Sequence, residues 1–384
     1  MTKKQINAIL LGIVICSIFL NSCAQKSIDI IYDGHVYIRT DVNDVAIGNF
    51  MYDTGAPDFY LDTTFVRNNN FQFKEVKNIQ IGGVGNQTQI VNQVNNKIYY
   101  KVDEKYNDSR ETYLIGLKEF MGERIDGILG VKTFLDRPHK IDFINKKLTF
   151  TDRYKSYDSI KFIYNGDRIY IPMEYTIDKK KYSGKFILDL GSTVTVLNST
   201  SGIDAAFGSN LIAIGGIGGE TTGKTLFVDN FKLGNQCISN YPIDISTDTK
   251  GALADAEFDG LLGTDILDDF DIGINLQKKI LYLKPNKKNN KHNKLRYKSF
   301  SYIDNTSTDE SWIVSYIYLD TDAYRKGLRL YDKILEINGV KVTELNRVEF
   351  YKSLKLNQEL ELLISRNEEA IKINLVLDKF LGSN

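Results

Sequence analysis

The stretch Phe50-Met51-Tyr52-Asp53-Thr54-Gly55-Ala56 is the strongest indication of the fold, because a similar stretch occurs later in the chain as Phe186-Ile187-Leu188-Asp189-Leu190-Gly191-Ser192. In each copy an apolar run leads into an aspartate, and a glycine stands two positions after that aspartate. Glycine permits the backbone conformations that tight turns require. The pattern therefore predicts a strand ending in a sharp turn with the aspartate at the turn, once in each of two similar lobes.

The repeat continues beyond these turns, which indicates a duplicated structural unit. Each copy next has a glycine-rich segment, then an Asp-Gly-apolar-apolar-Gly element, then a strand-like run with lysines in its middle. These segments lie at 79–85, 126–130 and 141–150 in the first copy, and at 212–219, 259–263 and 272–283 in the second. The spacing agrees as well, since 74 residues separate Asp53 from Gly127 and 71 separate Asp189 from Gly260.

Local patterns predict a mainly β fold. Short runs of Val, Ile, Phe, Tyr and Thr between Gly, Asn and Asp are typical of strands. The segments 145–147 and 277–279 are predicted as hairpin tips. One short helix is predicted over 133–136 and one over 264–269, with Thr264 as the capping residue of the second.

The composition is that of a globular protein with a substantial core. The 384 residues are 42% hydrophobic, and a chain of this length suits two or three domains. The formal net charge is zero, so the composition suggests no nucleic-acid partner. The three histidines and three cysteines lack the spacing of a metal site or a disulfide framework. We therefore expect neither a metal nor a cofactor.

Residues 1–22 are expected to form a signal peptide. Two lysines precede an apolar run, from Ile6 to Leu20, that is short for a membrane span. The sequence Leu20-Asn21-Ser22-Cys23 resembles the lipobox of bacterial lipoproteins, although Asn21 departs from the usual small or apolar residue. The resemblance implies lipidation at Cys23 and a lipid-anchored location in the bacterial cell envelope, facing the periplasm. A plain secretory signal and an uncleaved anchor are the alternatives.

A third unit is predicted at 301–384, after a basic, asparagine-rich linker at 286–300 that is typical of a solvated connector. Its strongest local signal is the Asn338-Gly339 hairpin turn. Strands are predicted at 312–319, 332–340, 359–366 and 371–377, and helices at 322–328 and 344–354.

The third unit carries the pattern Ala323-x-x-x-Gly327-Leu328, followed by Asp332-x-Ile334-Leu335-x-Ile337-Asn338-Gly339-Val340. This order resembles bacterial PDZ domains, although Tyr331 stands where those domains usually have glycine. The resemblance implies an α+β PDZ-like domain that binds a peptide C-terminus or an exposed strand. The segment 302–311 is a candidate for its binding loop.

Over residues 30–285, the doubled Asp-x-Gly turns, glycine-rich segments and apolar-Gly elements resemble the aspartic peptidases, both retroviral and pepsin-like. This resemblance implies a bilobal aspartic-protease-like β fold, with one lobe at 23–154, the other at 155–285 and a cleft between them. It also implies the site residues, which are the catalytic Asp53 and Asp189, the turn residues Thr54, Gly55, Gly191 and Ser192, and the flap residues Gly82, Gly83, Gly215 and Gly216.

Ionising two neighbouring carboxyl groups at once costs electrostatic free energy, so the pair shares one proton, as aspartic proteases illustrate. One aspartate would then act as general base on a water molecule, and the other would donate a proton to the scissile carbonyl oxygen. The sequence does not assign these roles to Asp53 or Asp189 individually. We expect Asp126 and Asp259 to be structural turn residues.

The sequence departs from the family at several points. The family has Thr or Ser after the catalytic aspartate, where its hydroxyl braces the two turns; Thr54 fits, but Leu190 lacks a hydroxyl. Ser192 is a candidate for a compensating hydroxyl near the carboxylate. The Asn- and Gln-rich stretch 86–96 suggests a mobile or enlarged loop. Lys132 occupies the position that Asp265 has in the second copy.

Two functions of different classes follow. The first is a membrane-anchored aspartic endopeptidase that cleaves polypeptide, with substrate capture by the PDZ-like domain. The second is a catalytically inactive peptide-binding lipoprotein with a decayed protease fold, because an isolated Asp-Thr-Gly is commonly only a turn and the glycine-rich segments could be ordinary hairpins. A small-molecule hydrolase has no supporting Ser-His or metal signature.

Overall fold

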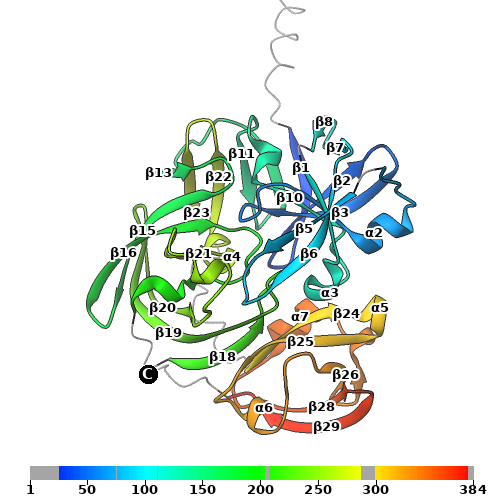
Figure 1. The fold of residues 1–384 in the computed structure, drawn as a ribbon. Coiled ribbons are helices and arrows are strands. Elements are labelled where there is room, and N and C mark those ends of the chain that lie inside the picture. Colours follow the sequence, from blue (N-terminus) through cyan, green and yellow to red (C-terminus); the bar gives the residue numbers. More distant parts are fainter. Residues whose placement is uncertain (1–25, 75, 110, 204–207, 287–298, 379–384) are drawn as a thin grey trace, which may run out of the picture.

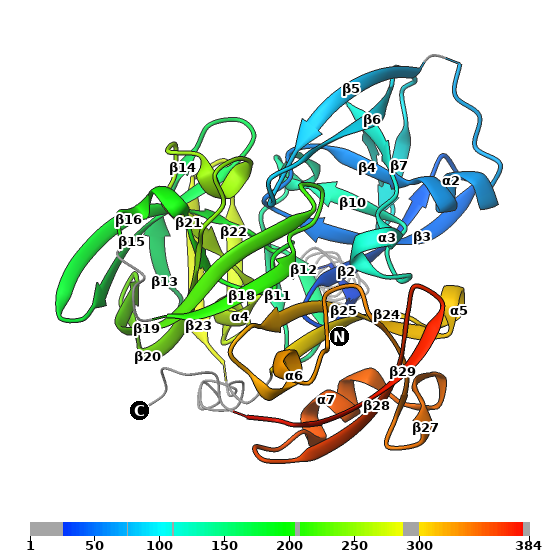
Figure 2. The same cartoon turned by 60° about the horizontal axis from the view of Figure 1, so that its bottom comes forward.

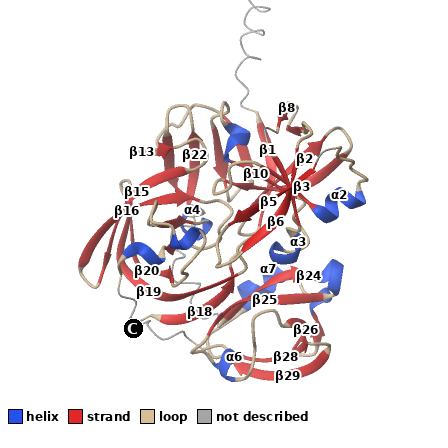
Figure 3. Cartoon of the chain, viewed as in Figure 1, coloured by secondary structure: helices blue, strands red, loops and turns tan. Residues whose placement is uncertain are grey.

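The structure is a computed structural model that describes residues 26–74, 76–109, 111–203, 208–286 and 299–378 (Figure 1). Strands account for 52% and helices for 12%, which confirms the mainly β fold class (Figure 3). The predicted signal peptide, Cys23 and most of the predicted linker lie outside the described residues. Within the described ranges, none of the helices has the length and hydropathy of a membrane span.

The first half of the body, residues 26–154, consists of twelve strands and three short helices. Its strands are β1 (Ser27–Tyr32), β2 (Val36–Val42), β3 (Ala46–Asp53), β4 (Phe59–Asp62), β5 (Val76–Gly82), β6 (Thr88–Val94), β7 (Tyr99–Val102), β8 (Lys105–Asp108), β9 (Thr112–Ile115), β10 (Gly127–Gly130), β11 (His139–Asp142) and β12 (Lys147–Phe150). Its helices are α2 (Thr63–Asn68), α3 (Lys118–Met121) and the 3₁₀ helix η2 (Val131–Phe134).

The second half, residues 158–286, repeats this plan. Its strands are β13 (Asp158–Lys161), β14 (Ile163–Tyr164), β15 (Ile169–Ile177), β16 (Lys180–Leu188), β17 (Val196–Leu197), β18 (Ser209–Ile214), β19 (Glu220–Leu233), β20 (Gln236–Ser246), β21 (Gly260–Leu262), β22 (Phe270–Asn275) and β23 (Ile280–Pro285). Its helices are the 3₁₀ helices η3 (Ser199–Ser201) and η4 (Ala252–Ala254), and α4 (Thr264–Leu267).

The two halves join through a run of six strands in the order β13-β23-β22-β11-β12-β1. The run is symmetric about the β11–β22 pair, where Lys140 lies opposite Gly273. These two residues are 133 positions apart, the same interval that separates Gly127 from Gly260, so they hold equivalent places in the two copies. The duplicated halves are therefore related by an approximate two-fold axis through this pair.

One continuous apolar core supports both halves. It includes aromatic residues from the strands that precede the two aspartates, among them Phe50 on β3 and Phe186 on β16, which are both fully buried. Each of these rings contacts an aromatic partner within its own half, Phe59 and Phe231 respectively. The aspartate turns therefore stand on packed strands rather than on free loops, which fixes their positions.

The C-terminal unit, residues 299–378, has a separate apolar core around Trp312. Its elements are β24 (Phe300–Asn305), α5 (Thr306–Asp309), β25 (Ser311–Tyr318), α6 (Asp322–Arg325), β26 (Lys333–Ile337), β27 (Val340–Lys341), the 3₁₀ helix η5 (Val342–Glu344), α7 (Arg347–Ser353), β28 (Glu359–Arg366) and β29 (Glu369–Val376). Strand β24 was not among the predicted elements. The binding-loop candidate 302–311 spans the end of β24, helix α5 and the start of β25.

The hairpin tips lie where the sequence places them, and helix α4 lies within the predicted 264–269, but η2 (131–134) begins two residues before the predicted 133–136. Two further local predictions are wrong. Thr264 does not cap α4; it is the first residue of that helix, and its hydroxyl donates to the carbonyl oxygens of Gly34 (2.6 Å) and Ser192 (3.1 Å). The stretch 86–96 is not an enlarged loop, because most of it forms β6, paired with β5. Burial alternates along β6, with Thr88, Ile90 and Asn92 exposed on one face of the hairpin and Val91 buried on the other.

Candidate active site

The two aspartate turns lie against each other across the join between the halves. A Cβ atom added to Gly55 would lie 2.7 Å from Asp189 Cγ, and one added to Gly191 would lie 2.4 Å from Asp53 Cγ. Each carboxyl group therefore rests on the glycine of the opposite turn, and no larger residue fits there. The sequence predicted that Asp53, Asp189, Gly55 and Gly191 meet, and the structure brings all four together.

The carboxyl groups are held by backbone N–H groups and influence each other. Asp53 Oδ1 accepts hydrogen bonds from the N–H groups of Gly55 (2.8 Å) and Ala56 (3.1 Å), and Asp189 Oδ1 accepts one from Gly191 (2.9 Å). The two side chains also act on each other's pKa, because Asp189 lowers the pKa of Asp53 and Asp53 raises the pKa of Asp189. Two carboxyl groups this close favour a state in which one of them carries a proton.

Burial raises the pKa of both groups above the ordinary aspartate value. The pKa of Asp53 is raised by burial, against which the N–H group of Gly55 acts by stabilising the ionised form. The pKa of Asp189 is raised well above the ordinary value, by burial first and then by the negative charge of Asp53. The site therefore favours one ionised and one protonated carboxyl group, which titrate as a pair.

Each aspartate turn is backed by the apolar-Gly element of its own half. Strand β10 runs parallel to β3, with Gly130 opposite Asp53. Strand β21 runs parallel to β16 in the same way, and the Asp189 N–H donates to the carbonyl oxygen of Leu262 (3.0 Å). Added Cβ atoms at Gly130 and Gly263 would lie 2.3 Å and 2.4 Å from backbone oxygens. Glycine is needed at these positions because the backbone that follows each aspartate turn, at Asp58 and at Val194, passes this close.

The aspartates that begin these elements make backbone contacts away from the dyad. Asp126 Oδ2 accepts a hydrogen bond from the N–H group of Asn49 (2.9 Å), and Asp259 Oδ2 accepts the equivalent bond from Lys185 (2.8 Å). Asp126 also pairs with Lys118 (2.9 Å). Both carboxylates therefore tie an element to the strand that carries the catalytic candidate, in line with the structural role expected for them.

A brace of hydrogen bonds joins the turns from one side only. Thr54 is fully buried; its hydroxyl donates to the Leu188 carbonyl oxygen (2.6 Å) and accepts from the Leu190 N–H (3.0 Å). The Leu190 side chain is fully buried in the apolar core and offers no return bond. The predicted compensation by Ser192 is wrong, because its hydroxyl donates to the carbonyl oxygen of Val194 (2.7 Å), within its own turn.

The glycine-rich segments form the tips of two hairpins that meet, which we call flap 1 (β5–β6, tip 83–87) and flap 2 (β18–β19, tip 215–219). The N–H of Gln87 in flap 1 donates to the Gly218 carbonyl oxygen in flap 2 (2.9 Å). Gly83 and Gly215 lie at this contact, since their added Cβ atoms would meet Ile217 and Val84 respectively. Gly82 and Gly216 lie beside it, with no neighbour in the opposite flap within 4 Å of an added Cβ.

Each flap places an apolar side chain in the opposite half. Val84 of flap 1 packs against a second-half cluster that includes Ile187 and Phe258, and Ile217 of flap 2 packs against a first-half cluster that includes Met51 and Tyr60. Met51 and Ile187 lie two residues before Asp53 and Asp189, so they share a strand face with the aspartates. The flaps therefore close over the face from which the dyad projects.

The sequence contains a further repeat that we did not identify from it. Ile31-Tyr32-Asp33-Gly34-His35 matches Ile163-Tyr164-Asn165-Gly166, and the strands that follow are Val36-Tyr37-Ile38 and Ile169-Tyr170-Ile171. The shared Ile-Tyr-Asx-Gly motif is the signal that could have revealed it. The turns place His35 beside one aspartate turn and Arg168 near the other.

These two turns give the dyad unlike surroundings. The His35 ring hydrogen-bonds to the Gly191 backbone, and burial lowers the pKa of His35, which favours a neutral ring. The positive charge of Arg168 lowers the pKa of Asp53, and its guanidinium lies 6.0 Å from the Phe258 ring centre. No ion-pair partner is found for Arg168 among the residues that the structure describes. Lys132 bridges the halves beside it, through Asp58 (3.0 Å) and Asp167 (2.8 Å).

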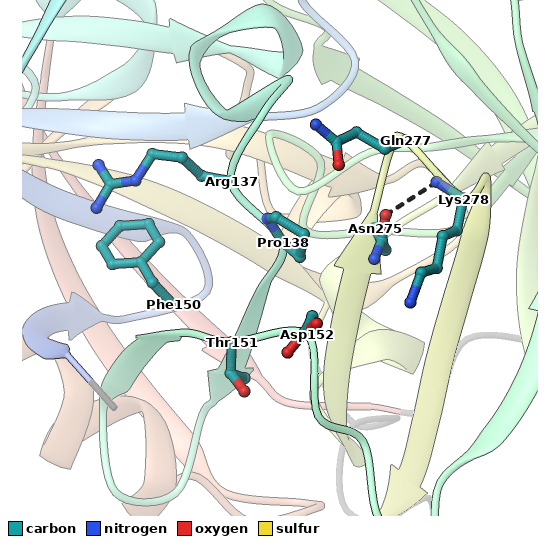
Figure 4. A pocket seen from close by; sticks show the side chains of 8 residues that line it. All are labelled: Arg137, Pro138, Phe150, Thr151, Asp152, Asn275, Gln277 and Lys278. Atoms are coloured by element: carbon teal, nitrogen blue, oxygen red, sulfur yellow. Dashed lines mark hydrogen bonds between the residues drawn. The ribbon is translucent and has the colours of Figure 1, made fainter. Parts of the chain in front are cut away.

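A separate pocket opens where the two halves join, and it is lined by residues from 137–152 and 275–278 (Figure 4). The Arg137 guanidinium stacks on Phe150, 3.4 Å from the ring centre, and the Lys278 N–H donates to Asn275 Oδ1 (2.9 Å). Neither aspartate of the dyad lines this pocket. No cluster of three or more His, Cys, Asp or Glu side chains suited to a metal ion occurs in the described ranges.

Comparison with known proteins adds no assignment. No protein-family model matches the chain, and no curated protein matches it.

Proposed function

We propose that this protein is an aspartic endopeptidase, in which Asp53 and Asp189 activate a water molecule to hydrolyse a peptide bond. The observation that carries the proposal is the contact between the turns, where each carboxyl group lies on the glycine of the other and each shifts the other's pKa. A structural pair of buried carboxyl groups would be costly without a role, because burial disfavours the charged form.

The reaction balances with these two groups alone. The ionised carboxylate takes a proton from water while the water oxygen bonds to the carbonyl carbon, and the protonated carboxyl gives its proton to the carbonyl oxygen. As the C–N bond breaks, the carboxyl group that took the water proton gives it to the leaving nitrogen, and a hydroxyl of the tetrahedral intermediate gives its proton to the other carboxylate, which restores the starting pair. The stronger rise in the pKa of Asp189 favours it as the proton holder in the resting pair.

The flaps suit a polypeptide substrate. Both are hairpins whose tips carry free backbone groups of the kind that pair with an extended chain. In the structure some of these groups are already paired: the Gln87 N–H of flap 1 bonds to the Gly218 carbonyl oxygen of flap 2, and the Gly83 carbonyl oxygen of flap 1 accepts from the Ala252 N–H at the start of η4 (2.9 Å each). An extended peptide would replace these contacts when it enters, and closure would exclude water from the dyad.

Other expectations from the sequence remain proposals. We propose that a lipid on Cys23 holds the protein at the bacterial cell envelope, and that the C-terminal unit is a PDZ-like domain that captures substrate polypeptide. The observation that favours the alternative, an inactive peptide-binding protein, is the missing hydroxyl at Leu190. The brace through Thr54 weighs against it, because that single side chain already bonds to both the carbonyl and the N–H of the opposite turn.

The test is cleavage of a peptide library by the mature protein and by its Asp53→Asn and Asp189→Asn variants. We expect each variant to lose at least about a thousandfold in kcat/KM, because the pair acts as one unit. Asp152→Asn, which alters an exposed carboxylate, is the matched control and should keep full activity. Inhibition of the wild type by a statine-containing peptide would support the dyad, whereas full activity in either dyad variant would overturn it.

A further inference from the structure

Flap 2 is part of a sheet that continues into the C-terminal unit. Strand β18, the outer strand of flap 2, pairs antiparallel with β25, with Leu211, Ile212 and Ala213 opposite Tyr318, Ile317 and Tyr316. The N–H of Leu319 extends the ladder by donating to the Asn210 carbonyl oxygen (2.9 Å). Figure 2 shows β18 and β25 running side by side. Both edges of β18 are therefore paired, since β19 holds the other one.

Buried side chains reinforce this junction. Leu211, Ala213 and Tyr318 form a small apolar cluster of their own, and Ile212 packs on the core of the C-terminal unit. The Tyr316 hydroxyl donates to Asp244 Oδ2 at the base of the flap (3.4 Å). Opening flap 2 would expose this apolar surface and break a strand pairing.

Tyr331, in the C-terminal unit, has an unusual backbone conformation and lies near the tip of flap 2. Tyr331 has φ of +70°, a region in which a bulky side chain is strained. Burial and the nearby negative charge of Glu220, the first residue of β19 after the flap 2 tip, raise the pKa of Tyr331, so the two side chains lie near each other. Position 331 is the one at which the sequence departs from the glycine expected in a PDZ-like domain. The positive φ of Tyr331 costs free energy, and a side chain near Glu220, which glycine would lack, is what the residue provides in return.

In the part of the chain that the structure describes, flap 1 lacks a strand pairing of this kind, and its tip bonds instead to a loop of the second half: Asn86 donates to Asp248 Oδ1 (2.9 Å) and accepts from the N–H groups of Thr249 (3.0 Å) and Lys250 (3.1 Å). Strand β5 pairs only with β6 among the described strands and ends its sheet. Its residues are mostly exposed, and Ile90 on β6 is 76% exposed. Outside the tip, nothing in the described C-terminal unit holds this hairpin.

The C-terminal unit is itself fastened to the first half. An added Cβ at Gly122, directly after α3, would lie 2.8 Å from the Asp304 carbonyl oxygen on β24. The next residue, Glu123, accepts a hydrogen bond from the Ser307 N–H (2.5 Å), and Arg347 on α7 pairs with Asp33 (3.2 Å). The unit thus bridges flap 2 and the opposite half of the body, below both in Figure 1.

We infer that the C-terminal unit locks flap 2 closed, so that the candidate active site admits substrate by movement of flap 1 alone. The consequence for catalysis rests on the proposed function, but the difference in mobility between the flaps does not. A ligand that displaces the C-terminal unit would release flap 2 as well, which makes this unit a regulator of access to the dyad.

Hydrogen–deuterium exchange of the full chain tests the lock without needing activity. We expect amides of 76–94 to exchange at least about tenfold faster than those of 209–220, because the flap 2 amides can exchange only when β18 separates from β25. Tyr331→Gly removes the side chain that lies near Glu220 and also relieves the strained φ, so we expect the C-terminal unit to stay folded. Amide exchange in 209–220 should then rise about threefold or more. Asn367→Gly is the matched control, because it also relieves a positive φ (+52°) but lies in the β28–β29 turn. Equal exchange in the two flaps of the wild type would overturn the lock.

Two disulfide staples, made in a Cys237→Ser background, test the consequence for the site. Ala213→Cys with Tyr316→Cys joins flap 2 to the C-terminal unit at opposed positions. Gly83→Cys with Ile217→Cys joins the two flap tips, where the Cβ atoms would lie 3.3 Å apart, close to disulfide range.

Oxidation of the first staple should leave peptide cleavage within about twofold, and oxidation of the second should reduce it at least about a hundredfold. Loss of cleavage on the first staple, or full cleavage with the second, would overturn the inference. If the wild type cleaves no peptide, the proposed function fails and the exchange experiment still decides the lock.

Discussion

The two halves share one strand plan, yet each keeps a different part of a symmetric site. The first half supplies the bracing hydroxyl of Thr54 and the flap that has no strand pairing with the C-terminal unit, whereas the second supplies the apolar Leu190 and the flap joined to that unit. A site with two-fold symmetry needs only one bracing hydroxyl, because a hydrogen bond across the axis fixes both turns relative to each other. The missing hydroxyl at Leu190 therefore removes a redundant contact and leaves the dyad in place.

The largest expected effect comes from the glycines that both halves retain. Gly191→Ala would place a Cβ 2.4 Å from Asp53 Cγ and must push the turns apart. We expect cleavage to fall at least about a hundredfold, because misplacement of reacting groups by about 1 Å has this effect. Gly82→Ala, whose Cβ meets only a methyl group at 3.6 Å, is the control that should keep activity. Wild-type kcat/KM in Gly191→Ala would show that the turns do not need this contact.

The second effect separates the two residues that follow the aspartates. Thr54→Val leaves the Leu188 carbonyl and the Leu190 N–H buried and unpaired, so we expect urea unfolding to show a loss of about 2–4 kcal/mol and a lower kcat. Leu190→Thr should also lose about 1–3 kcal/mol, because it buries a hydroxyl in place of an apolar side chain, but it should give no large gain in kcat. A gain from no activity to measurable activity in Leu190→Thr would instead identify the protein as a decayed enzyme.

A third effect concerns the base of flap 2, where burial raises the pKa of Asp244 to about 7. Asp244 takes the strand position that Tyr113 has in the first half, since Asp244 pairs with Val196 and Tyr113 with Tyr60. The raised pKa means that the folded state binds this proton more tightly than the unfolded chain does. Stability from this group is therefore full below pH 4 and is lost as the pH rises toward 7.

Asp244→Asn should flatten that part of the pH dependence, as measured by urea unfolding between pH 4 and 8. The groups that face Asp244 are the hydroxyls of Thr225 and Tyr316 and the carboxyl of Asp265. An unchanged slope in the variant would show that Asp244 is not the group responsible.

The smallest effect lies at the two Ile-Tyr-Asx-Gly turns. Removing the Arg168 cation by Arg168→Gln should raise the pKa of Asp53 and move the acidic limb of kcat/KM to higher pH, by less than about one unit. Arg39→Gln, at an exposed site on β2, should leave the limb in place. A shift of that limb to lower pH in Arg168→Gln would contradict the electrostatic role of Arg168.

Much of the body could be predicted from the sequence because the repeat places elements in pairs. The strands, the hairpin tips at 145–147 and 277–279, and the meeting of Asp53 with Asp189 all follow from matched spacing. What could not be predicted depends on contacts between distant segments: Ser192 bonding within its own turn, and β24 and β18 pairing with β25. Such pairings are set by tertiary packing rather than by the β propensity of individual residues, so a local sequence pattern does not predict them.

The central claim, that Asp53 and Asp189 hold one proton between them, is tested most directly by ¹³C NMR titration of aspartate-labelled protein. The account predicts that Asp189 titrates well above the ordinary aspartate range in the wild type, and that Asp53→Asn lowers its pKa by removing the neighbouring charge. An Asp189 pKa that is ordinary in the wild type, or unchanged in Asp53→Asn, would contradict it.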